Sequence, residues 1–109
     1  MTAIVKPHAV DLVRKALQAA EVPGLTVSAT IGFGRQGGHT ETYRGTEYAI
    51  DFVPKVKVEV VVPTERAEAI ADLIRSTATS GKIGDGKIWI TAVDDVVRIR
   101  TGERGVDAV

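Results

Sequence analysis

The sequence predicts an α+β sandwich built from one domain, residues 1–109, with two helices and four strands. Two segments repeat apolar residues every three or four positions, which is the period of an amphipathic helix. The segments between them alternate apolar and polar residues or are rich in β-branched residues, which is typical of strands. The apolar content of 44% is enough for a core, and 109 residues is the length of a single domain.

The first half of the chain predicts a strand, a helix and a second strand. An apolar run over 2–6 ends at Pro7 and predicts the first strand. A helix is expected over 8–20, and a strand over 25–33 after the break at Pro23. The apolar positions expected on one face of the helix are Val10, Leu12, Val13, Ala16, Leu17 and Ala20. Those expected on one side of the strand are Leu25, Val27, Ala29, Ile31 and Phe33.

The middle of the second half predicts a third strand and a second helix. Residues 53–63 contain a strict polar/apolar alternation over 55–60, which predicts a strand with one apolar face and one exposed polar face. The polar face is expected to carry Lys55, Lys57 and Glu59. Thr64 is expected to cap a helix over 65–77. The apolar stripe of that helix contains Ala67, Ile70, Ala71, Ile74 and Ala78.

The end of the chain predicts a glycine-rich turn over 80–86, a fourth strand over 87–93 and a short extended piece over 96–101. A flexible polar tail is expected over 102–109. The resulting order is the split β-α-β-β-α-β pattern of ferredoxin-like domains. That fold supports many functions, so it does not indicate one by itself.

Residues 34–51 show neither the helical period nor the alternation of a strand, and they predict a long loop between the second and third strands. The segment is rich in glycine and contains both tyrosines, Tyr43 and Tyr48. Loops of this length in compact domains are usually functional. An exposed tyrosine suits a partner pocket or covalent modification, although tyrosines more often pack onto the body of a domain. The length of the segment favours a functional loop.

The composition excludes several classes of function. Lys and Arg number 14, as do Asp and Glu, and this balance argues against a general binder of nucleic acid or anionic membranes. The chain has no cysteine, which excludes disulfides, thiolate metal sites and thiol catalysis. Only two histidines are present, His8 and His39, which argues against a His-rich zinc site. Without a membrane-spanning run or a signal peptide, a soluble cytoplasmic protein is expected, and its small size favours oligomerisation.

The segment 81–87, Gly-Lys-Ile-Gly-Asp-Gly-Lys, has the glycine and lysine spacing of a phosphate-binding P-loop. It departs from that motif because Ile88 follows in place of Ser or Thr, and because a helix precedes the turn and a strand follows it. The glycines would still let backbone N–H groups approach an anion, with charge from Lys82 and Lys87. On the local pattern alone, a mobile connection with solvated lysines is the favoured alternative.

Arg98 and Arg100 would point to the same side of an extended strand. Two adjacent guanidinium groups favour an anion between them, and arginine suits phosphate oxygens. Surface salt bridges to Asp94, Asp95 or Glu103 explain the two arginines equally well. Combined with the glycine turn, the arginines would enclose a polyphosphate.

Several ordered blocks of sequence strongly resemble the PII nitrogen-regulatory signal proteins, over essentially the whole chain. The blocks are 32–36 (GFGRQ) with 38–41 (GHTE), 43–48 (YRGTEY), 52–57 (FVPKVK), 81–87 (GKIGDGK) and 98–103 (RIRTGE). In the terms of that family, 34–51 is the long T-loop, 80–87 the glycine-rich B-loop and 102–109 the C-terminal tail.

The resemblance implies a cytoplasmic homotrimer of ferredoxin-like subunits that acts as a signal protein and not as an enzyme. It implies binding of ATP or ADP in clefts between subunits, and of 2-oxoglutarate together with Mg-ATP. It also implies docking through the long loop on targets such as an ammonium transporter, nitrogen-metabolism enzymes or a nucleotidyltransferase. Nucleic acid is not an implied partner, and a membrane is implied only through a transporter.

The resemblance also implies roles for particular residues. Those implied to bind the nucleotide are Thr26, Gly32, Arg35, Glu59, Val61, Gly84, Asp85, Gly86, Lys87, Arg98 and Arg100. Those implied to bind 2-oxoglutarate are Gln36, Gly38, Lys55 and Gly84, with Lys55 on the distal carboxylate and Gln36 also on magnesium. Tyr48 matches the family's modified tyrosine, which receives UMP in some lineages and AMP in others.

Two alternatives stay open: a PII-like paralogue that senses another small ligand, and a weak ATP hydrolase. Gly37 stands where many family members have Lys or Arg, which keeps the first open, while Gln36 and Lys55 argue against it. No sequence feature positions a water for hydrolysis, and Asp85 would as easily cap the glycine turn. Ser80 replaces a usual threonine, which is a mild departure.

Overall fold

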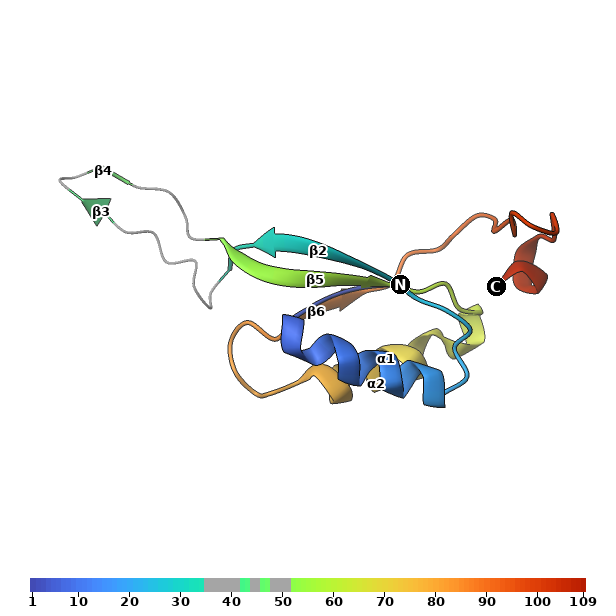
Figure 1. Ribbon diagram of the computed structural model, residues 1–109, viewed down its shortest axis with the longest axis horizontal. Coiled ribbons are helices and arrows are strands. Elements are labelled where there is room, and N and C mark those ends of the chain that lie inside the picture. The colour runs from blue at the N-terminus through green and yellow to red at the C-terminus, as the bar shows by residue number, and fades with distance from the viewer. Residues whose placement is uncertain (35–41, 44–45, 48–51) are drawn as a thin grey trace.

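The computed structural model describes residues 1–34, 42–43, 46–47 and 52–109. Apart from a short pair of strands within the expected long loop, its helices and strands follow the order expected from the sequence (Figure 1). They are β1 (Thr2–Val5), α1 (Val10–Ala19), β2 (Thr26–Gly32), β3 (Thr42–Tyr43), β4 (Thr46–Glu47), β5 (Val53–Glu59), α2 (Ala67–Ala78) and β6 (Gly86–Trp89). Three short 3-10 helices are η1 (Pro7–Ala9), η2 (Thr64–Arg66) and η3 (Gly105–Ala108).

Four of the strands form one antiparallel sheet in the order β2-β5-β1-β6. Helices α1 and α2 lie side by side against one face of this sheet, as Figure 1 shows. This order, with the first and third strands of the β-α-β-β-α-β pattern in the centre, confirms the predicted ferredoxin-like fold. No helix in the described ranges is long and apolar enough to cross a bilayer.

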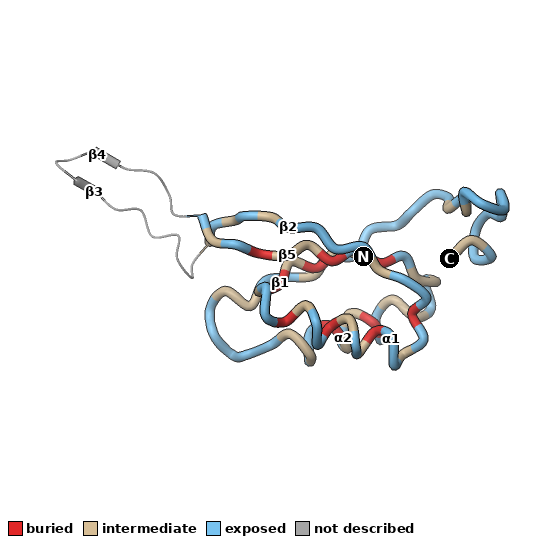
Figure 2. Tube along the Cα trace, viewed as in Figure 1, coloured by how far each residue is buried: buried red, intermediate tan, exposed pale blue. Residues whose placement is uncertain are grey.

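The core lies between the sheet and the two helices (Figure 2). Alternate residues of the central strands enter it, and both helices contribute their predicted stripes. Its largest fully buried side chains are Val5, Val13, Leu17, Val58 and Ile74. The prediction for the first helix was wrong at one position, because Leu12 is 55% exposed on the solvent side of α1.

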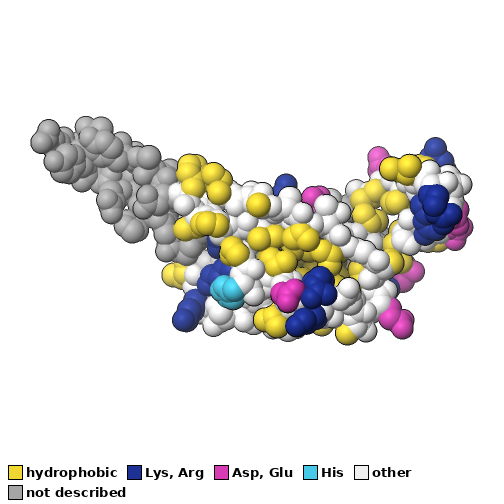
Figure 3. Space-filling model, in the orientation of Figure 1, with side chains coloured by type: hydrophobic (Ala, Val, Ile, Leu, Met, Phe, Trp, Pro, Cys, Tyr) yellow, Lys and Arg dark blue, Asp and Glu magenta, His cyan; other side chains and the backbone are white. Residues whose placement is uncertain are grey.

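The apolar side of β2 is not covered by the helices. Val27 pairs with Val58, so the two side chains leave the sheet on the same face, yet Val58 is buried and Val27 is 45% exposed. Ile31 and Phe33 continue this exposed line, and the Phe33 ring contacts Phe52 edge to face at 5.9 Å between centroids. Figure 3 shows hydrophobic side chains gathered on this side of the molecule, from the grey segment to above the helices.

Several predicted boundaries were too generous. Strand β5 ends at Glu59 rather than at 63, and β6 covers Gly86–Trp89 rather than 87–93. Thr64 does not cap the second helix with its side chain; it begins η2, and Pro63 precedes that turn. The predicted extended piece over 96–101 is also wrong, because Val97 forms a single bridge with Arg104 and the chain turns between them.

Two further segments carry structure that the sequence did not predict. Inside the expected long loop, β3 and β4 pair antiparallel, with Thr42 opposite Glu47 and Tyr43 opposite Thr46. The expected flexible tail ends in the single-turn helix η3. Figure 1 shows the chain after β6 running away from the sheet before it reaches this turn.

The connection between α2 and β6 is organised by one carboxylate, that of Asp85. It accepts hydrogen bonds from the backbone N–H groups of Ser80 at 2.7 Å and Gly81 at 3.0 Å, and from the Ser80 hydroxyl. The Lys6 ammonium lies 3.2 Å from the same carboxylate. These hydrogen bonds, chiefly those from Ser80, together with the Lys6 charge hold the pKa of Asp85 well below its usual range.

Gly86 allows β6 to pair with β1. Its φ is +103°, a conformation that favours glycine, and a Cβ built there would lie 1.7 Å from the Ile4 carbonyl oxygen. That distance is far inside van der Waals contact and the obstacle is backbone, so no side-chain movement relieves it. Glycine at this position is therefore required for the register that places Lys87 opposite Ile4.

We predict that Gly86→Ala lowers the free energy of unfolding by about 2–5 kcal/mol, from the backbone clash and the unfavourable φ together. Urea titration at fixed protein concentration measures the loss. Gly24→Ala is the matched control, since a Cβ there meets nothing within 4 Å and the backbone carries no positive φ. Equal stability of the two variants would contradict the proposed close contact.

We predict that Asp85→Asn destabilises the protein near neutral pH, and that the difference from wild type shrinks as the pH falls. Because folding lowers the pKa of Asp85, its stabilisation is present above the unfolded carboxyl pKa of about 4 and is lost as pH falls through the lower folded value. Thermal unfolding at several pH values measures this. Asp72→Asn removes an exposed carboxylate from α2 as a control, and a pH-independent difference for Asp85→Asn would refute the linkage.

Candidate functional site

The sheet face opposite the helices carries a cavity of about 410 Å³ beside the glycine turn. Apolar side chains from three segments contribute to its wall, namely Phe33, Ile83 and Trp89. Five of the residues expected at a ligand site also line it: Gly32, Lys55, Gly84, Gly86 and Lys87. We call it the lysine cavity, because two ammonium-bearing side chains reach it from different strands.

Lys55 is buried, whereas its alternating strand predicted an exposed lysine. The residue is only 7% exposed, and its ammonium donates a hydrogen bond to the Gly84 carbonyl oxygen of the glycine turn. Burial lowers the pKa of Lys55 and the neighbouring Lys6 charge lowers it further, while the Asp85 carboxylate opposes both effects. Among the described residues Lys55 makes this one hydrogen bond, and an ammonium group has two further protons to donate.

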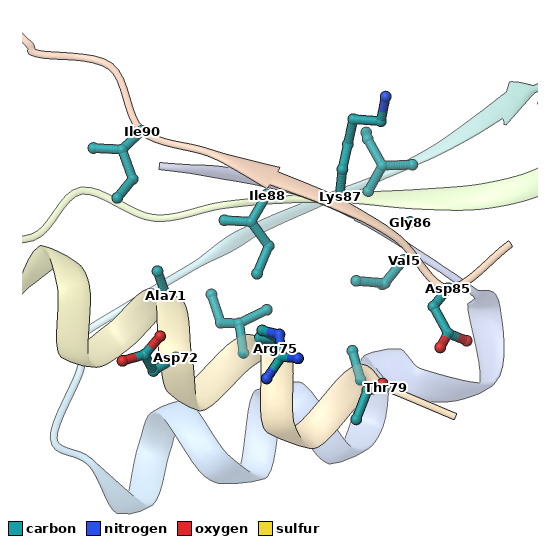
Figure 4. A pocket seen from close by; sticks show the side chains of 13 residues that line it. Val5, Ala71, Asp72, Arg75, Thr79, Asp85, Gly86, Lys87, Ile88 and Ile90 are labelled. Atoms are coloured by element: carbon teal, nitrogen blue, oxygen red, sulfur yellow. The ribbon is translucent and has the colours of Figure 1, made fainter. Parts of the chain in front are cut away.

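Lys87 reaches the same cavity from β6. It lies opposite Ile4 in the ladder, and Figure 4 shows its side chain leaving the strand on the side away from α2, while Ile88 points toward the helix. The cavity thus combines two lysines, a glycine-rich backbone and an apolar wall. This combination suits an anionic ligand with a carbon skeleton, such as a carboxylate or a phosphate ester.

A second cavity, of about 610 Å³, lies at the other end of β5. Thr26 and Glu59 face each other across β2 and β5 and both line it, together with Val61 and Arg98. These four residues were expected to bind a nucleotide. We call it the arginine cavity. Its donors and acceptors are a hydroxyl, a carboxylate and a guanidinium, which suit a polar ligand.

The two arginines do not form the expected paired site. Because the chain turns at 99–101, Arg98 and Arg100 do not lie on one side of a strand. The Arg98 guanidinium pairs with the Glu103 carboxylate at 2.7 Å, so the alternative of a surface salt bridge is confirmed for this residue. Arg100 is exposed in the turn and lines neither the lysine cavity nor the arginine cavity.

Most of the described residues expected at one nucleotide site therefore fall into two groups within this chain. The two cavities share no residue among those described. Lys55 and Glu59 are four positions apart on one strand face, which is about 13 Å at about 3.3 Å per residue. One chain holds both groups but does not bring them around a common space.

Four expected residues, Arg35, Gln36, Gly38 and Tyr48, lie outside the described residues. Asp85 does not line the lysine cavity; it borders a different cavity of about 490 Å³ between α2 and β6, shown in Figure 4. Most of the side chains that line that cavity are apolar, and Asp72, Arg75 and Thr79 of α2 line it as well. Within the described ranges, no three His, Asp or Glu side chains are grouped to hold a metal.

Sequence reasoning missed Lys6. It stands just after β1, where a single lysine before Pro7 carries no distinctive signal in the sequence. The pairing of Asp85 with Lys6 appears only when β1 and the glycine turn are brought together by the sheet.

Comparison with known proteins identifies the family. The family model described as nitrogen regulatory protein P-II matches residues 1–103. A nitrogen regulatory protein P-II of Rhizobium meliloti is 57% identical, and one of Mesorhizobium japonicum 55% identical, each over 98% of this chain and 96% of the relative. The crystal structure of Arabidopsis thaliana PII bound to citrate superposes with a TM-score of 0.81 at 40% identity, covering 99% of this chain and 88% of that one. The chain belongs to the P-II nitrogen regulatory protein family.

Proposed function

We propose that this protein reports cellular nitrogen, carbon and energy status by binding ATP or ADP and 2-oxoglutarate between its subunits. The observation that carries the proposal is the buried Lys55 ammonium, held on the Gly84 carbonyl at the edge of a cavity that Lys87 also lines. The cost of burying an ammonium is offset when an anion binds to it. Citrate in the Arabidopsis relative is an anion of the same carboxylate class.

The separation of the lysine and arginine cavities favours a nucleotide site shared between copies. In this proposal, Gly84, Gly86 and Lys87 of one copy hold phosphate, and Thr26, Glu59 and Val61 of the next copy hold the adenosine. Arg98 and Arg100 would come from that second copy, and Arg35 would reach phosphate across the same interface. Asp85 and Gly32 support the turn and the strand that border the phosphate side. A closed ring of three copies would make three such sites.

The proposed 2-oxoglutarate site uses the protons that Lys55 still has available. Its ammonium would take the distal carboxylate, and the backbone at Gly84 and Gly38 would border the ligand. The lysine cavity offers cations and carbonyls rather than a group of carboxylates, so magnesium would arrive with ligand oxygens and Gln36 would add an amide oxygen. Magnesium supplies charge neutralisation between the phosphates and the keto acid.

The proposed output is a change in the long loop over 34–51, since Gln36 stands at its beginning. Ligands that prefer one loop arrangement shift its population, and targets read that shift. The targets we propose are an ammonium transporter, nitrogen-metabolism enzymes or a nucleotidyltransferase that modifies Tyr48. We place the protein in the cytoplasm and give it no catalytic role, in keeping with relatives that are named regulatory proteins.

We predict that Lys55→Gln weakens 2-oxoglutarate binding in the presence of Mg-ATP by about thirtyfold or more, because a buried charge partner is lost. ATP binding alone should change little, which also shows that the variant is folded. Isothermal titration calorimetry measures both constants. Lys57→Gln, two positions along the same strand face, is the matched control. Equal 2-oxoglutarate affinity with and without ATP in the wild type would refute the shared-magnesium arrangement.

We predict that two defective variants complement each other if the nucleotide site is shared. Of the lysine and arginine cavities, Lys87 lines only the first and Arg98 only the second, so Lys87→Ala and Arg98→Ala each alter one side of the proposed site. Each alone should bind ATP weakly, whereas random mixed oligomers should regain about a quarter of the sites, since half the copies supply each intact side. Counting ATP sites after co-refolding tests this. Mixed oligomers without regained sites would show that each site lies within one chain.

A further inference from the structure

The Gly84–Asp85 segment is held from two sides by lysines of different segments. Lys55 of β5 donates to the Gly84 carbonyl, and Lys6, just after β1, pairs with the Asp85 carboxylate at 3.2 Å. The Asp85 carboxylate also accepts hydrogen bonds from Ser80 and Gly81, which fix the start of the glycine turn to its end. The position of the Gly84 carbonyl over Lys55 therefore depends on Asp85 and, through Asp85, on Lys6.

The same contacts couple the charges. The charged groups facing Lys55 in the described residues are Lys6 after β1, Asp85 of the glycine turn, Lys87 of β6 and Lys57 two positions along β5. Lys6 opposes the Lys55 charge and Asp85 supports it. Lys6 and Asp85 act on Lys55 in opposite directions, with Lys6 the stronger, and removal of either partner leaves the effect of the other unopposed.

We propose that Lys6 and Asp85 are positioning residues for the carboxylate ligand of Lys55: their ion pair keeps the Gly84 carbonyl against the ammonium and balances the charge beside it. The inference rests on the proposed function, because it takes 2-oxoglutarate as the ligand of Lys55. It assigns a role to Lys6, which is not among the described residues that line the lysine cavity and which reaches the glycine turn through Asp85.

Removing Asp85 and removing Lys6 change the electrostatic environment of Lys55 in opposite directions. In Asp85→Asn, the unpaired Lys6 charge makes Lys55 easier to deprotonate. In Lys6→Gln, the unpaired Asp85 carboxylate makes it harder. A role that is only structural predicts the same sign for both variants, because both break one contact. The sign of the pH response therefore separates positioning by charge from general loosening of the turn.

The test measures 2-oxoglutarate affinity with Mg-ATP by calorimetry at about pH 7 and about pH 9.5. We expect affinity to fall with pH in the wild type, to fall by roughly threefold or more further in Asp85→Asn, and to fall less in Lys6→Gln. The exposed Asp11–Lys15 pair of α1 supplies matched controls, Asp11→Asn and Lys15→Gln, which should follow the wild type. Lys6→Arg, which keeps the charge, should restore the wild-type profile.

A second readout needs no ligand. The side-chain carbon resonances of Lys55 in lysine-labelled protein report its protonation directly by NMR. We expect its titration to move to lower pH in Asp85→Asn and to higher pH in Lys6→Gln. If both variants weaken binding equally at both pH values and leave the Lys55 titration unchanged, the inference is wrong. If the wild type binds no 2-oxoglutarate although Lys55 titrates as expected, the proposed ligand is wrong instead.

Discussion

The approach of Gly86 to the Ile4 carbonyl is the constraint on which the rest of the site depends. It sets the register of β6 on β1, so that Lys87 leaves the sheet on the open face and the preceding turn ends beside β5. Only then can Lys55 reach the Gly84 carbonyl and Asp85 reach Lys6. A residue with no side chain therefore determines where two buried or half-buried charges are compensated. The energetic reason is that an ammonium removed from water needs a fixed acceptor, and a strand-anchored turn supplies one.

Much of the fold could be predicted from hydrophobic periodicity. The stripes of α1 and α2 and the alternation of β5 give the element order, and that order leaves few sheet topologies. Two departures, at Leu12 and Val27, share one physical cause, since periodicity reports which residues could be buried and not how far a helix extends over a sheet. Leu12 fits the helical period but lies on its solvent side, and Val27 fits the strand period on a strand that the helices do not cover.

The candidate site was less predictable from the residues themselves. The lysine of a strictly alternating strand gives no sign that its ammonium is covered, because the glycine turn that covers it is 29 positions away. Arg98 and Arg100 were predicted to lie on one side of a strand, because no residue in the local sequence indicates the turn that begins between them. The resemblance to a known family supplied the residues at the site. The structure added how they divide between two cavities, and the partner role of Lys6, which depends on contacts between distant segments.

The order β2-β5-β1-β6 leaves an unpaired backbone edge at each side of the sheet among the described strands. When the β2 edge of one copy meets the β6 edge of another, the contact is head to tail, and every added copy is rotated by the same angle. A rotation that divides a full turn evenly ends growth in a finite ring with no edge left over, whereas any other rotation continues into a filament. In an assembly of that kind, the angle between neighbouring sheets would decide between a closed particle and a fibre.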